Sequence, residues 1–128
     1  MWLAVLFCAV FMLLIAAAVH SAMLPVDTPR ARANRMLLRA PILPIDQAEP
    51  VYVEALALAQ ESGDGLLCSE ACYGLGDICM RRRQFDKAEA HFSRALSYMD
   101  RWYEHKPNYE RLLQSRLEEA RNQAHAAW

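Results

Sequence analysis

The stretch "ACYGLGDICMRRRQFDKAEAHFSRAL", residues 71–96, contains two apolar patterns of helical spacing on either side of a short polar turn. In the first pattern, which begins three residues before the stretch at Cys68, apolar residues recur at steps of four, three and four. This spacing places them on one face of a helix. In the second, Ala88, Phe92 and Ala95 form a similar face. The first face continues slightly upstream and consists of Cys68, Cys72, Leu75 and Cys79. The stretch therefore predicts an antiparallel pair of helices.

The second of these helices has a counterpart earlier in the chain. "PIDQAEPVYVEAL" (residues 44–56) aligns with "QFDKAEAHFSRAL" (residues 84–96) at a shift of forty positions. Self-similarity at a fixed period of this size indicates a repeat architecture. The identical pairs are Asp46/Asp86, Ala48/Ala88, Glu49/Glu89, Ala55/Ala95 and Leu56/Leu96.

Residues 71–96 resemble a tetratricopeptide repeat (TPR), with a small Ala71, the Leu75-Gly76 pair and an aromatic Phe85 at the turn. The resemblance implies an all-α fold of antiparallel helical hairpins with a C-terminal capping helix, over residues 45–128. It also implies that residues 45–62 are the second helix of a preceding repeat whose first helix is missing or degenerate. The sequence departs from the family pattern at Cys72, Cys79 and Arg83, where Trp, an aromatic residue and Gly are common.

Six residues are expected to carry the packing of the repeat. Gly76 and Ala88 are small where two helices must approach closely, and Phe92 is expected to fill the space beside them, so enlarging either small residue should overpack the interface. The full set is Leu75, Gly76, Phe85, Ala88, Phe92 and Ala95.

The N-terminal segment, residues 1–23, is strongly apolar. Trp2–Val19 is a run of 18 residues without a charge, which as a helix would span roughly 27 Å, close to the thickness of a bilayer core. A single transmembrane anchor is the favoured interpretation. A cleaved signal peptide is the alternative, although no Lys or Arg precedes the apolar run.

Residues 24–44 are basic and rich in proline, and are interpreted as a linker at the membrane surface, in which residues 30–40 could form a short helix. Arg30, Arg32, Arg35 and Arg39 are the candidate contacts to lipid phosphate, with an ordinary linker as the alternative. Because these four arginines follow the apolar segment and none precedes it, the positive-inside rule places the C-terminal domain on the cytoplasmic or an equivalent inner side, for example of an organelle inner membrane.

Candidate partner-binding residues are Tyr73, Asp77 and the terminal Trp128. TPR proteins that grip a C-terminal carboxylate present cations from the first helices of their repeats. The corresponding helix here presents Glu70, Tyr73 and Asp77, so an apolar or basic segment is the expected ligand. Residues 45–128 hold ten Lys and Arg against fourteen Asp and Glu, which also suits a basic ligand.

The chain shows no catalytic motif, phosphate-binding loop or nucleotide fingerprint, and its net charge of −1 does not indicate nucleic-acid binding. Cys68, Cys72 and Cys79 could be read as metal ligands with His91 or His105, but a buried packing role is favoured. We therefore expect no enzyme activity, metal, cofactor or small-molecule substrate.

The leading hypothesis is a membrane-anchored TPR scaffold or accessory subunit that contacts the bilayer and the protein subunits of a larger membrane complex. One alternative is an anchored receptor that binds basic amphipathic peptides such as presequences. The other is a small secreted helical protein, formed if the apolar segment is removed.

Overall fold

The computed structural model describes residues 1–23, 27–100 and 106–127, and within these ranges every regular element is helical. The predicted all-α class is therefore confirmed. The elements are α1 (Trp2–Met23), α2 (Pro29–Arg39), the 3₁₀ turn η1 (Ala40–Ile42), α3 (Ile45–Ser62), α4 (Gly65–Arg81), α5 (Phe85–Met99) and α6 (Pro107–Ala126).

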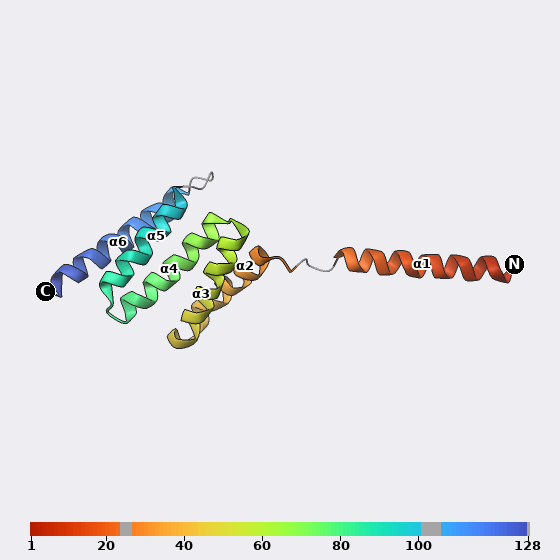
Figure 1. Ribbon diagram of the computed structural model, residues 1–128, viewed down its shortest axis with the longest axis horizontal. Helices are drawn as coiled ribbons and strands as arrows, with labels where there is room; N and C mark the ends of the chain where they lie inside the picture. Colours follow the sequence, from red (N-terminus) through yellow and green to blue (C-terminus); the bar gives the residue numbers. More distant parts are fainter. Residues whose placement is uncertain (24–26, 101–105, 128) are drawn as a thin grey trace.

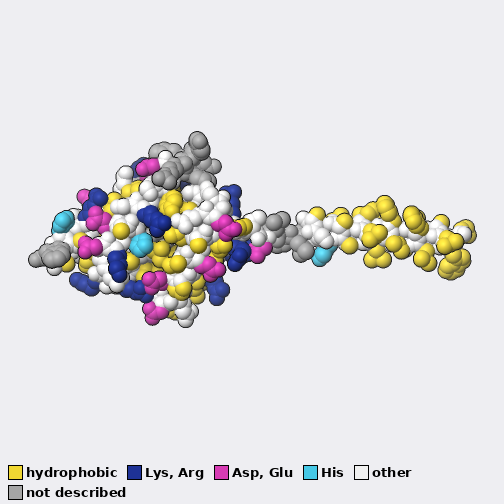
Figure 2. Space-filling view, viewed as in Figure 1, with side chains coloured by type: hydrophobic (Ala, Val, Ile, Leu, Met, Phe, Trp, Pro, Cys, Tyr) yellow, Lys and Arg dark blue, Asp and Glu magenta, His cyan; other side chains and the backbone are white. Residues whose placement is uncertain are grey.

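Helix α1 stands away from the other helices (Figure 1). Residues 2–22 are all exposed, and apolar side chains cover the helix along its length, whereas the rest of the molecule carries charges of both signs (Figure 2). By length and composition α1 is the one helix of the described residues able to cross a membrane, a property that signal sequences share.

Helices α2 to α6 form a stack in which each helix packs against the next in the chain (Figure 1). Short connections join them, so neighbouring helices run antiparallel. The order is a hairpin of α2 and α3, a hairpin of α4 and α5, and the additional helix α6.

Helix α2 forms where a short helix was considered, but it packs against α3, whereas residues 24–44 were predicted to be a linker at the membrane surface. The side chains of Ala33, Leu37 and Ala40 are buried against α3, at steps of four and three residues along the helix. Thr28 caps the helix by accepting a hydrogen bond from the Ala31 amide at 3.1 Å, and Pro29 occupies its first turn. Helix α2 thus forms a hairpin with α3, at the place where the first helix of a preceding repeat was expected to be missing or degenerate.

The glutamate common to the two similar helices has the same role in each. Glu49 of α3 accepts a hydrogen bond at 2.5 Å from Arg82, the residue after α4. Glu89 of α5 accepts one at 2.8 Å from Arg121 of α6. Each glutamate therefore links the second helix of a hairpin to the element that follows it, which gives a structural reason for the repeated sequence.

Helix α4 lies at the centre of the stack and has the longest buried face. A Cβ added to Gly76 would come within 2.6 Å of the Phe92 ring, so α4 and α5 approach too closely for a side chain there. The Ser69 hydroxyl donates to the Ala95 carbonyl at 2.9 Å and lies 3.2 Å from the Tyr109 hydroxyl. These bonds satisfy the polar groups where α4, α5 and α6 meet.

Candidate interaction groove

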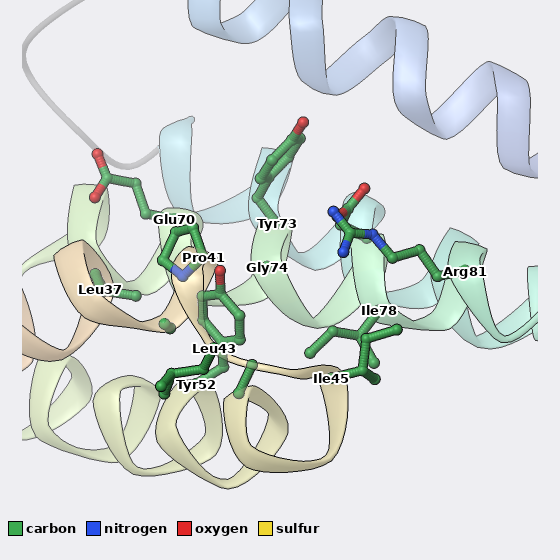
Figure 3. A pocket seen from close by; sticks show the side chains of 13 residues that line it. Leu37, Pro41, Leu43, Ile45, Tyr52, Glu70, Tyr73, Gly74, Ile78 and Arg81 are labelled. Atoms are coloured by element: carbon green, nitrogen blue, oxygen red, sulfur yellow. The ribbon is translucent and has the colours of Figure 1, made fainter.

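A groove runs along one face of α4, between this helix and the α2–α3 hairpin (Figure 3). Its volume is about 240 Å³. Helix α2 and η1 form one wall, the start of α3 forms the floor, and α4 forms the other wall. The lining residues are Leu37, Ala40, Pro41, Leu43, Ile45, Ala48, Tyr52, Glu70, Tyr73, Gly74, Asp77, Ile78 and Arg81.

The floor of the groove depends on a close contact between Tyr52 and Gly74. The Tyr52 ring lies so near the Gly74 backbone that a Cβ at this position would overlap it. Because Gly74 has no side chain, the ring packs closely against α4 and is almost fully buried. Burial, followed by the charge of Asp77, raises the pKa of the Tyr52 hydroxyl, which therefore stays protonated at neutral pH.

Charged groups of opposite sign lie at the two ends of the groove. Figure 3 shows Glu70 at one end and Arg81 at the other, with Tyr73 between them. Burial raises the pKa of Glu70, although the charge of Lys106 acts in the opposite direction. The ionised form of Glu70 is therefore held in an environment that disfavours it.

Asp77 is engaged by two arginines. Its carboxylate lies 3.2 Å from Arg81 on the same helix and 2.5 Å from Arg116 of α6. The Arg116 guanidinium also stacks over Phe92, 5.6 Å from the ring centroid. Asp77 consequently fastens α6 to α4 in addition to lining the groove.

Of the three predicted partner-binding residues, the structure brings two together. Tyr73 and Asp77 both line the groove, one turn apart on α4. Tyr73 is half-buried, and its ring contacts that of Phe92 at a centroid distance of 5.8 Å. Trp128 lies outside the described residues.

The wall formed by α2 and η1 was not predicted from the sequence. Leu37, Pro41 and Leu43 belong to the segment that was interpreted as a linker. The signal that could have identified this wall is the spacing of Ala33, Leu37 and Ala40, which is helical but lies among four arginines.

The four arginines of residues 24–44 fall into two pairs. Arg30 lies 2.8 Å from Asp64, and Arg32 lies 3.8 Å from Glu54, so both contact the helical stack. Arg35 pairs with Asp27, and Arg39 lines a shallow depression beside it. The predicted lipid-contacting set therefore divides into arginines directed to the stack and arginines on the outer side of α2.

The predicted packing residues lie at the α4–α5 contact. Leu75, Gly76, Ala88, Phe92 and Ala95 are buried, and Phe85 is half-buried at the turn, with the Arg83 guanidinium 5.7 Å from its ring centroid.

The three cysteines of α4 are free and buried. Burial raises the pKa of the Cys72 thiol to about 11, and it also raises the pKa values of Cys68 and Cys79. These thiols are therefore protonated at neutral pH, which suits packing rather than nucleophilic or metal-ligand chemistry. Among the described residues, no group of three His, Cys, Asp or Glu side chains is placed to hold a metal ion.

Comparison with known proteins identifies the central hairpin. The family model of the tetratricopeptide repeat matches residues 69–102, which include most of α4 and all of α5. No curated protein and no solved structure matches the chain. Members of this family typically serve in protein–protein interaction and are not catalysts. The chain therefore contains a tetratricopeptide repeat, formed by α4 and α5 within an all-helical stack.

Proposed function

We propose that the chain is a non-enzymatic, membrane-anchored scaffold or accessory subunit that holds a segment of another protein in the groove between α2 and α4. The observation that carries this proposal is an open, largely apolar groove on the first helix of a TPR. Helix α1, fully exposed and long enough to cross a bilayer, supports the anchored location.

The size of the groove favours a protein segment over a small molecule. Small-molecule sites commonly occupy about 300–1,000 Å³ and enclose their ligand. The groove holds about 240 Å³ and is open to solvent, which is room for one or two anchoring side chains. Apolar side chains of a partner would rest on Pro41, Leu43 and Ile78, with polar groups near Glu70 and Arg81.

Purification of the tagged full chain from membranes in mild detergent tests this function. The wild-type chain should arrive with a stoichiometric protein partner. Pro41→Asp, which places a charge on the exposed apolar lip of the groove, should remove that partner. Val53→Asp puts the same charge on an exposed position of α3 outside the groove and should retain it. A wild-type chain that purifies only as a monomer would argue against a scaffold.

A second candidate function is a receptor for basic amphipathic peptides, and the environment of Glu70 favours it. Burial raises the pKa of Glu70, so its charge is costly in the empty groove. A lysine or arginine of a bound peptide would offset that cost.

The pH dependence of peptide binding tests this receptor function. A cationic peptide prefers ionised Glu70, so its affinity should fall as the pH falls through the raised pKa of this carboxyl. Glu70→Gln should weaken binding and remove that pH dependence, whereas Glu61→Gln, at an exposed position near the end of α3, should change neither. Absence of saturable binding by the wild-type chain would favour the scaffold.

The intact mass of the native protein distinguishes both candidates from a secreted product. A chain extracted from membranes that retains the α1 residues would support the anchor, and the four arginines that follow α1 then favour the cytoplasmic or equivalent inner side for the helical stack. A chain that begins near Ala22 would be a secreted helical protein.

A further inference from the structure

The outer side of α2 and η1 exposes large apolar side chains beside arginines. Leu38 is 73% exposed and Ile42 is 83% exposed, more than any other large apolar side chain described outside α1. Arg35, Leu38 and Ile42 follow one another at steps of three and four residues, so they share one face. This face is opposite to the buried stripe of Ala33, Leu37 and Ala40.

The ion pairs of α2 leave the cations of this outer face directed away from the stack. Arg30 and Arg32 contact Asp64 and Glu54 of the stack. Arg35 instead pairs with Asp27, a residue of the short segment between α1 and α2, and its side chain stays 59% exposed. Arg39 is exposed and lies in the same depression as Arg35.

The chain itself limits how far this face can be from a membrane. Residues 24–28 connect the end of α1 to the start of α2. A fully extended residue covers at most about 3.6 Å, so the connection reaches roughly 20 Å. If α1 spans a bilayer, α2 therefore stays close to the lipid headgroups, at an effective concentration high enough for weak contacts to act.

We propose that the outer face of α2 and η1 docks onto an anionic membrane surface, with Leu38 and Ile42 inserted at the headgroup level and Arg35 and Arg39 bound to lipid phosphate. This arrangement is that of an interfacial amphipathic helix, with apolar side chains in the acyl boundary and cations at the headgroups. It rests on the anchoring of α1 that forms part of the proposed function. Docking would fix the orientation of the stack on the bilayer, with α6 at the far end.

Site-directed spin labelling of the full chain in lipid nanodiscs tests the proposal. Single cysteines replace Leu38, Ile42 or Val53 in a Cys8→Ser background, because Cys8 is exposed whereas the other native cysteines are buried. Accessibility to oxygen, which partitions into lipid, is compared with accessibility to a water-soluble relaxation agent. Nanodiscs of phosphatidylcholine with phosphatidylserine are compared with phosphatidylcholine alone.

In the anionic nanodiscs, labels at positions 38 and 42 should be several-fold more accessible to oxygen than to the water-soluble agent. A label at Val53, 54% exposed on α3, should show the reverse preference. Arg35→Gln with Arg39→Gln should return the label at 38 to the aqueous pattern. The charge-matched control, Lys87→Gln with Arg111→Gln at exposed positions elsewhere, should not.

A label at Val10, within α1, separates failure of this proposal from failure of the anchor. If the Val10 label reports lipid while those at 38 and 42 report water, only the docking of α2 is overturned. Labels at 38 and 42 that are shielded from both agents would mean that a second copy of the chain covers the face, which also overturns the proposal. If the Val10 label itself reports water, the anchor and the docked face are both wrong.

Discussion

The two ends of the helical stack present different surfaces. At the C-terminal end, the side of α6 that faces away from α5 is exposed and mostly polar, with Arg111, Gln114, Ser115, Glu118 and Asn122. At the N-terminal end, the outer side of α2 and η1 exposes Leu38 and Ile42. A repeat stack needs a polar terminal element to face water. Helix α6 meets this requirement. The N-terminal end exposes apolar side chains instead, so it is better suited to contact with an apolar surface than with water.

The largest expected effects come from weakening the contact of each terminal helix with the core. Leu113 of α6 is fully buried, and Leu37 of α2 is 8% exposed. Truncating a buried leucine leaves a cavity, so Leu113→Ala should lower the free energy of unfolding by about 3–4 kcal/mol and Leu37→Ala by about 2–3 kcal/mol. Urea unfolding of the full chain in detergent measures both values. A loss well below 1 kcal/mol at Leu37 would mean that α2 is not part of the folded stack.

The N-terminal end is also fastened at Asp64, which precedes α4. Its carboxylate caps α4 by accepting from the Leu67 amide at 3.1 Å, and it lies 2.8 Å from Arg30 of α2. Asp64→Ala removes both contacts and should lower the free energy of unfolding by about 1–2 kcal/mol. Asp64→Asn keeps a capping oxygen and loses only the ion pair with a largely exposed arginine, so it should cost about 0.5 kcal/mol.

Unfolding of these two variants therefore separates the cap from the ion pair. Equal losses in Asp64→Ala and Asp64→Asn would show that the tie to α2 contributes more than the cap.

The centre of the stack was more predictable from sequence than its ends. The stripe from Cys68 to Cys79 and the face of Ala88, Phe92 and Ala95 stand in amphipathic surroundings, where periodicity alone indicates a hairpin. In α2 the apolar stripe is only three residues long, and the prolines and arginines around it are equally typical of a linker. Helix α2 joins the stack because its apolar stripe packs against the surface of α3. A contact of this kind is not visible in the local sequence pattern.

For the same reason, only the wall of the groove that α4 forms could be predicted from the sequence. Tyr73 and Asp77 could be placed on the correct face of α4 because they belong to the recognisable repeat. The opposite wall comes from α2 and η1, and the contact of Tyr52 with Gly74 depends on how two hairpins pack. Such contacts between hairpins are set by tertiary structure rather than by spacing.

The turns on the two sides of α4 have the same backbone geometry but different residues. Gly63 and Arg83 both adopt a left-handed backbone, with φ of 69° and 58°, and both turns close with the hydrogen-bond pattern of a Schellman motif. Gly63→Ala should cost about 1 kcal/mol, because only glycine adopts this conformation without strain. Arg83→Gly relieves that strain but loses the contact with Phe85. It should therefore stabilise the fold by about 0.5 kcal/mol, measured as a small rise in the melting temperature.

The smallest expected effect concerns the outer face of α2. Because Leu38 and Ile42 are exposed, Leu38→Gln with Ile42→Gln should change the free energy of unfolding by no more than about 0.5 kcal/mol per site in neutral detergent. Leu112→Gln, at the C-terminal end, should have a similarly small effect. A large loss on the α2 face alone would show that these side chains stabilise the fold. A neutral result means that the apolar surface at the N-terminal end does not contribute to stability, as expected of a docking surface.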